Sequence, residues 1–203
     1  MAKLYVGFDP GGQDAFGWSI CAGEGKRLSL KKWGSVNNCF EAFESVAHEC
    51  KKQTPDAIGI DAPLFWNYSG DRNADLAVRK LVKVHGGRPA TVNHVNSMRG
   101  ACLVQGVLVA RLARNRWPNV LITEAHPKAL KQVLQEARAF RKTLPKEGED
   151  GDHKHDAALA AYSAWIAHAQ TRAQTKDWQN LAPTRNSDEV YVPVGQVCYW
   201  FPK

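Results

Sequence analysis

Four carboxylates of this sequence stand where short elements begin or end. Asp9 closes the apolar run 4–8 and precedes a Pro-Gly-Gly turn, while Asp61 and Glu124 close two further apolar runs. Asp156 lies near the start of an alanine-rich stretch with a helical pattern. In an open sheet with helical crossovers, the carboxyl ends of the parallel strands form the ligand crevice. We therefore expect the four side chains to converge on one point.

Carboxylates gathered this closely raise one another's pKa, so the cluster needs cations if it is to remain ionised. Hard oxygen ligands without a cysteine or histidine core suit Mg²⁺ or Mn²⁺. A pair of such ions would activate a water molecule and stabilise the leaving oxygen of a phosphodiester. A single aspartate at a strand end is more often a turn former or a helix cap than a ligand. That alternative stays open for each acid taken alone.

The elements that must position these acids follow from hydrophobic periodicity and from turn residues. A hairpin, a third strand, a helix and a further strand predict a mixed sheet with at least one parallel pair. The alanine-rich helix has little side-chain volume, which predicts a close approach to the sheet. The predicted strands cover 3–9, 15–21, 27–33, 56–61 and 119–124. The main predicted helices begin at Asn37 or Asn38, at Ser97, at Lys128 and at Asp152, and the one from Lys128 ends at Ala139.

Regular patterning is lost over residues 64–96, which we interpret as an irregular basic insertion or lid. Its Arg72, Arg79 and Arg88 are candidates for phosphate binding, because guanidinium groups match phosphate oxygens in geometry and charge. The alternative is a solvated loop in which Arg72 or Arg79 pairs with Asp75.

Several short motifs occur in a fixed order along most of the chain. They are Asp9-Pro10-Gly11-Gly12, Gly59-Ile60-Asp61-Ala62-Pro63-Leu64, Arg72-x-x-Asp75-x-x-x-Arg79, Thr123-Glu124-Ala125-His126-Pro127 and Asp152-His153-x-x-Asp156-Ala157. Together they resemble the uncharacterised family of predicted RNase H-like nucleases, domain of unknown function four-two-nine. The resemblance implies an RNase H-like α/β fold, whose five-stranded mixed sheet has three antiparallel and two parallel strands and is flanked by helices.

The same resemblance implies roles for particular residues, by analogy with nucleases and resolvases of that fold. Asp9, Asp61, Glu124 and Asp156 would be the catalytic metal ligands, and Asp152, one helical turn earlier, is the reserve candidate.

Three further residues near these acids are candidates for substrate contacts. Lys128 closely follows a predicted ligand. His126 is a candidate hydrogen-bond donor to that ligand or a general acid, and otherwise a turn residue at a strand end. His153 is a candidate proton shuttle, and otherwise part of a solvated, capped helix terminus.

Composition limits the classes of function. The net charge of +7 favours an anionic partner, nucleic acid first, although a merely basic protein is an even alternative. The five scattered cysteines predict reduced thiols in a cytoplasmic protein and no zinc site. No apolar run approaches the length of a membrane span.

The length of 203 residues fits a single domain over 1–203, with a C-terminal extension over 172–203. The sequence therefore predicts a metal-dependent nuclease with Mg²⁺ or Mn²⁺. A nucleotide-binding module related to actin-like ATPases, or a nonenzymatic nucleic-acid or protein adaptor, is the alternative.

Overall fold

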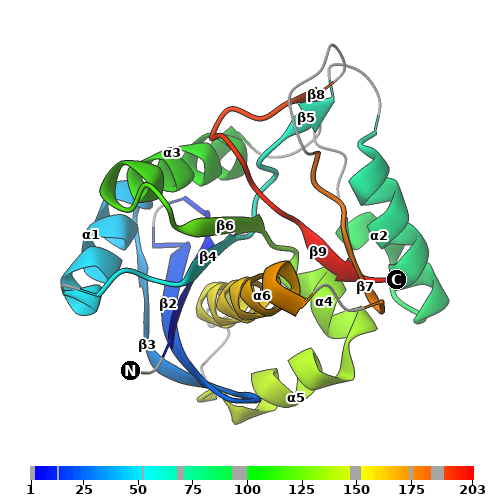
Figure 1. Cartoon of the computed structure of the whole chain (residues 1–203), viewed down its shortest axis with the longest axis horizontal. Coiled ribbons are helices and arrows are strands. Elements are labelled where there is room, and N and C mark those ends of the chain that lie inside the picture. The colour runs from blue at the N-terminus through cyan, green and yellow to red at the C-terminus, as the bar shows by residue number, and fades with distance from the viewer. Residues whose placement is uncertain are drawn as a thin grey trace.

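The computed structural model describes residues 3–12, 14–51, 53–67, 71–92, 100–146, 152–173, 176–183 and 190–203. Its centre is a sheet with the strand order β3-β2-β1-β4-β6 (Figure 1). The first three strands in the sequence pair antiparallel, and β4 and β6 join the sheet parallel to β1. The sheet therefore has the predicted RNase H-like arrangement. Its strands are β1 (Lys3–Asp9), β2 (Phe16–Glu24), β3 (Arg27–Val36), β4 (Ala57–Ile60) and β6 (Leu121–Glu124).

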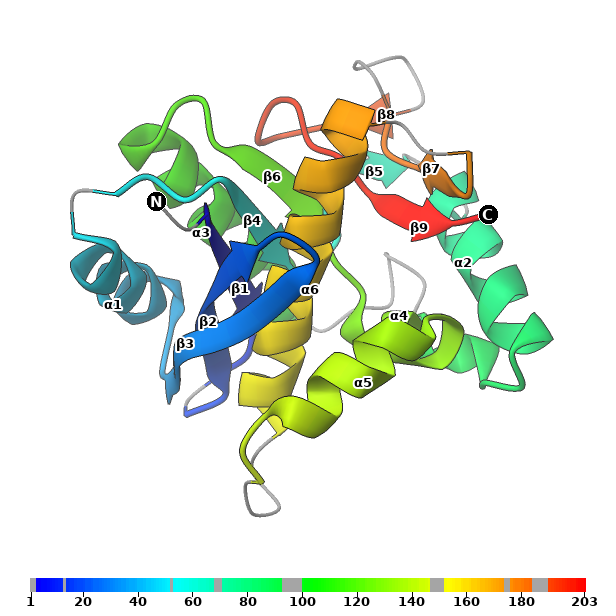
Figure 2. The same ribbon diagram turned by 60° about the horizontal axis from the view of Figure 1, so that its bottom comes forward.

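Helices cover both faces of the sheet (Figures 1 and 2). On one face α6 crosses all five strands, and α1 packs against α3 on the other. None of the helices formed by the described residues is long and apolar enough to cross a membrane. The helices are α1 (Cys39–Cys50), α2 (Asn73–Val84), the short 3-10 helix η1 (Pro89–Thr91), α3 (Gly100–Arg116), α4 (Pro127–Val133), α5 (Gln135–Thr143) and α6 (Asp152–Ala173).

Glycines on three adjacent strands let α6 approach the sheet closely. A Cβ atom placed on Gly7 of β1 would lie 1.8 Å from the backbone oxygen of Ala157, and one on Gly59 of β4 would lie 1.9 Å from that of Ala160. A Cβ on Gly17 of β2 would meet the helix backbone in the same way. Buried alanines face Gly7 and Gly59, whereas the backbone oxygen of His153 faces Gly17. The predicted close approach is confirmed, and it fixes the N-terminal half of α6 over the strand ends.

The region predicted as one helix over 128–139 is two helices, α4 and α5, which meet at Leu134. Leu134 has extended backbone angles and serves as the C-cap of α4 and the N-cap of α5. Arg138 donates from Nη1 to the carbonyl oxygens of Lys131 (3.0 Å) and Gln132 (2.8 Å). This side chain therefore satisfies carbonyls that the end of α4 leaves free, which hydrophobic periodicity alone does not reveal.

Short strands tie the two irregular regions to each other, and Cys198 ties the second region to the central sheet. The predicted insertion contains β5 (Trp66–Asn67), α2 and η1, and β5 pairs with β8 (Val190–Tyr191). In the predicted C-terminal extension, β7 (Trp178–Asn180) pairs with β9 (Trp200–Pro202). Cys198 extends the sheet beside β6, because it donates to Ile122 O (3.0 Å) and accepts from Glu124 N (2.9 Å).

Candidate active site

The sheet brings three of the predicted acids to one edge, with Asp9 and Asp61 at one level and Glu124 one residue earlier on its strand. Asp9 ends β1, Asp61 follows β4 directly, and Glu124 ends β6. In the parallel register Phe8 pairs with Ile60, which pairs in turn with Glu124. The acids therefore end adjacent strands side by side, as the sequence predicted.

A side chain from α3 supports the turn that follows Asp9. Gln105 donates from Nε2 to the carbonyl oxygen of Gly11 (2.6 Å), and its Oε1 accepts from Cys39 N at the start of α1 (2.7 Å). The Pro-Gly-Gly turn is thus fixed to both helices of that face, which limits the movement of Asp9.

Asp9, Asp61 and Asp156 influence one another electrostatically, and we call these three residues the aspartate cluster. Burial raises the pKa of Asp61 well above its usual value, and the charges of Asp9 and Asp156 raise it further. Burial, followed by the charge of Asp9, raises the pKa of Asp156 to about 6. Burial also raises the pKa of Asp9, and a hydrogen bond from His153 opposes that rise. A cation bound in this cluster would offset both the cost of burying the carboxylate charges and the repulsion between them.

Glu124 lies at the same edge, but its carboxylate is held by Arg72. Its Oε1 accepts from Arg72 Nη2 (2.7 Å), and its Oε2 accepts from Arg72 Nη1 (2.9 Å) and from Leu64 N (2.9 Å). Burial raises the pKa of Glu124, and the charge of Arg72 opposes this rise. Oε1 accepts a single bond and keeps a lone pair for another partner. Glu124 therefore stands beside the aspartate cluster as part of a separate ion network.

Arg72 is buried and has no donor left for a phosphate. Its five N–H groups donate to Asp75 through Nε (2.8 Å) and Nη2 (2.7 Å), to both oxygens of Glu124, and to Phe65 O (3.0 Å). The guanidinium carbon also lies 4.4 Å from the centroid of the Phe65 ring. This corrects the prediction of a phosphate contact at Arg72, and the pairing with Asp75 is the alternative that the structure has.

The other two arginines of the predicted insertion do not contact the aspartate cluster in the described part of the chain. Arg79 donates to Asp71 Oδ2 (2.6 Å) and to Val92 O (2.8 Å). Arg88 is exposed at the start of η1. The predicted phosphate contacts of these two arginines stay predictions.

The two predicted histidines have different surroundings. His153 donates from Nδ1 to Asp9 Oδ2 (2.7 Å) and leaves 44% of its side chain exposed. The hydrogen bond to Asp9 raises the pKa of His153. His126 donates from Nε2 to Thr91 O (2.9 Å), and burial lowers its pKa, so its ring is neutral at neutral pH. Only His153 touches the cluster.

Cations from α4 and α5 border the cluster on the α6 side. Lys128 Nζ lies 4.0 Å from Asp156 Oδ2, and the lysine side chain is 57% exposed. Arg141 Nη2 lies 3.5 Å from Asp152 Oδ1, and the Asp152 side chain is 69% exposed. Asp152 is thus paired at the surface. Sequence reasoning missed Arg141, although the excess of basic residues over 127–146 signalled it.

The donor chemistry of the cluster fits a hard divalent cation. Within the part of the chain that the structure describes, Asp156 Oδ1 is buried and has no hydrogen-bond partner, which is costly for a carboxylate oxygen and leaves it available as a ligand. The other donors are carboxylate oxygens, which Mg²⁺ and Mn²⁺ prefer. Among the described residues, no three His, Cys, Asp or Glu side chains already stand close enough together to hold an ion. Metal binding would therefore draw the carboxylates inward.

The strand order and the acids at the strand ends define an α/β protein of RNase H-like fold. The chain belongs to the family described as "Protein of unknown function (DUF429)", whose model matches residues 7–148. Among solved structures it is similar to RuvC of T. thermophilus in complex with a Holliday junction substrate. The identity is 16% and the TM-score 0.44, over 83% of this chain and 97% of the other. Similarity at this level carries no information on activity. The search of curated proteins finds no match.

Proposed function

We propose that the chain is a divalent-metal-dependent nuclease that hydrolyses phosphodiester bonds of a nucleic acid. The single observation that carries this proposal is the aspartate cluster at the carboxyl edge of an RNase H-like sheet, in which Asp156 Oδ1 is buried and has no hydrogen-bond partner among the described residues. A buried carboxylate oxygen without a partner is costly, so a cation is the simplest reason for its presence.

In this proposal Asp9, Asp61 and Asp156 hold the ions, and Glu124 is the fourth ligand through its remaining lone pair. Bound Mg²⁺ or Mn²⁺ would supply an activated water molecule and would stabilise the leaving oxygen. His153 orients Asp9 through its 2.7 Å hydrogen bond. Arg72 fixes the direction of Glu124, as hydrogen-bond partners of metal ligands commonly do.

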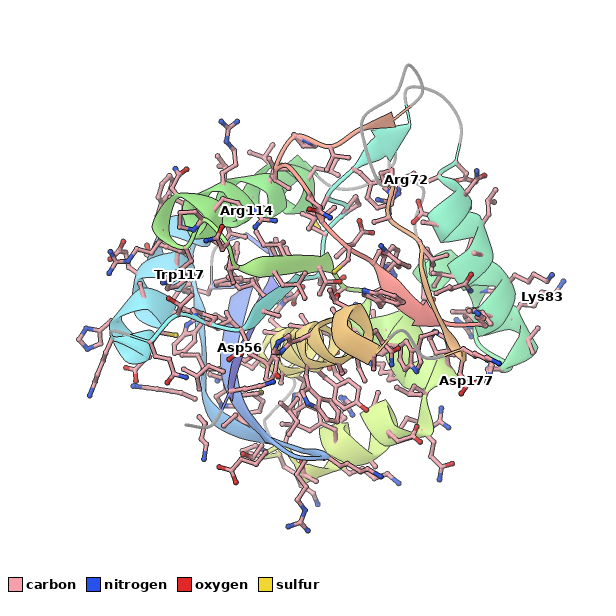
Figure 3. All side chains as sticks on the ribbon, viewed as in Figure 1. Asp56, Arg72, Lys83, Arg114, Trp117 and Asp177 are labelled. Atoms are coloured by element: carbon pink, nitrogen blue, oxygen red, sulfur yellow. The ribbon has the colours of Figure 1, made fainter. Side chains whose placement is uncertain are left out.

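The experiment is a cleavage assay on purified protein with MgCl₂ or MnCl₂. Labelled single-stranded DNA, duplex DNA, RNA, an RNA–DNA hybrid and a branched DNA serve as substrates. We expect cleavage of at least one substrate, and its loss in EDTA and in Asp9→Asn. The matched control is Asp177→Asn, because Asp177 is an exposed carboxylate beyond the C-terminal end of α6 (Figure 3). Full activity of Asp9→Asn, or equal loss in both variants, would contradict the assignment.

One observation favours a second candidate, a nonenzymatic nucleic-acid adaptor. Arg72 engages both oxygens of Glu124, and the acids of the described chain are not yet gathered at ligand spacing. If Mn²⁺ at millimolar concentration produced no heat in calorimetric titration while nucleic acid still bound, the adaptor would replace the nuclease.

A further inference from the structure

We propose that a strip of cations on α4 and α5 binds the phosphate backbone of the nucleic acid next to the aspartate cluster. The strip consists of Lys128, Lys131 and Arg141, and we call it the α4–α5 strip. The inference rests on the proposed function for the identity of the bound polymer. It adds a binding surface that lies outside the cluster of acids.

Positive charge is concentrated in this part of the chain. Residues 127–146 contain six Lys and Arg and a single Glu, a net +5 of the chain's +7. All other residues together therefore carry a net charge of only +2. The segment is formed by α4, α5 and the few residues after them, so the excess lies on one structural unit. Such an excess on one unit is the electrostatic signature of a polyanion-binding surface. The six cations are Lys128, Lys131, Arg138, Arg141, Lys142 and Lys146.

The strip lies beside the acids. Both α4 and α5 pack against α6, alongside its N-terminal half (Figure 2). Lys128 and Lys131 are three residues apart and share a helix face, and both act electrostatically on Asp156. Arg141 approaches Asp152 one turn earlier on α6. A phosphate backbone bound along the strip would therefore pass directly over the cluster.

The cations of the strip are available for phosphate. Lys128 is 57% exposed and lies 4.0 Å from the buried Asp156, while Arg141 lies 3.5 Å from the exposed Asp152. The contact between Arg141 and Asp152 is a surface pair, and such pairs contribute little to stability. The Arg141 side chain is 39% exposed, so part of it can be reached by a phosphate at the surface. Arg138 is excluded from the strip because it caps α4.

The cations in and beside α2 are of two kinds. Arg72 and Arg79 are engaged with carboxylates. Lys80 and Lys83 are exposed, and Lys83 points away from the body of the molecule (Figure 3). We therefore place the phosphate contacts on α4 and α5, next to the acids.

The test measures binding, with cleavage as a separate readout. Fluorescence anisotropy follows a fluorescein-labelled oligonucleotide, single-stranded and duplex, with CaCl₂ in place of MgCl₂. The strip variant is Lys128→Gln/Lys131→Gln/Arg141→Gln. The control, Lys80→Gln/Lys83→Gln/Arg88→Gln, removes the same charge from the predicted insertion. We expect the salt dependence of log Kd to become shallower by about three in the strip variant, about one per lost phosphate contact, and to stay near wild type in the control. Circular dichroism confirms that both variants fold.

Each outcome separates this inference from the proposed function. Equal weakening in both variants, or none in the strip variant, would overturn the inference, and persistent metal-dependent cleavage would then leave the nuclease intact. Loss of binding in the strip variant alone, with no cleavage by wild type in any metal, would support the strip and refute the nuclease. Binding of phosphatidylserine vesicles in preference to the oligonucleotide would identify a membrane surface and overturn the inference.

Discussion

Replacing Asp156 with Asn should stabilise the metal-free protein at neutral pH. Burial and the charge of Asp9 raise the pKa of Asp156 from 3.8 to about 6. Because the folded-state pKa is the higher one, folding favours the protonated carboxyl. The penalty for the ionised form is absent below pH 3.8 and fully present above pH 6. At 1.36 kcal/mol per unit it amounts to about 3 kcal/mol at pH 7.5 and about half of that at pH 5.

Thermal unfolding in EDTA between pH 4 and pH 8 measures this effect. For a protein of this size about 3 kcal/mol corresponds to a rise in Tm of about 6–12 °C at pH 7.5, which should vanish near pH 4. The matched control is Asp152→Asn, one turn earlier on α6, whose side chain is 69% exposed and should yield no stabilisation. A lower Tm for Asp156→Asn at pH 7.5, or a gain that does not depend on pH, would refute the electrostatic account of the cluster.

Three further predictions concern the supports of the site. Arg72→Met leaves two buried carboxylates without their partner and should cost about 3–5 kcal/mol in urea unfolding; a loss below about 1 kcal/mol would contradict the buried network. Gly59→Ala places a Cβ 1.9 Å from a backbone oxygen of α6, so it should lower the free energy of unfolding by about 1–3 kcal/mol or more. In the control Gly12→Ala the added Cβ meets open space, so the free energy of unfolding should not fall in this way. His153→Gln should weaken Mn²⁺ affinity about 10–100-fold in calorimetry by releasing Asp9, and unchanged affinity would exclude that role.

The sequence predicted the features of the fold that depend on local residue patterns. Apolar runs that end in Asp9, Asp61 and Glu124 predicted strand ends, and the sheet places them side by side. The alanines of α6 predicted the close approach that the strand glycines permit. Both predictions depend on side-chain size and hydrophobic periodicity, which can be read directly from the sequence.

Contacts between distant segments could not be predicted from local patterns. Arg72 and Glu124 are 52 positions apart, so spacing suggested only the neighbour Asp75, and burial of the guanidinium depends on how α2 meets β6. The break at Leu134 depends on Arg138 reaching back to the end of α4. The same packing brings the exposed Lys128 of α4 next to Asp156.

Anomalous diffraction from a crystal of the protein soaked in MnCl₂ is the decisive test of the metal site. We expect an anomalous peak among the carboxylates of Asp9, Asp61 and Asp156, with Asp156 Oδ1 as a ligand, and no such peak in Asp9→Asn. Wild-type crystals that show no manganese there, or show it only elsewhere on the surface, would contradict the metal site and the nuclease built on it.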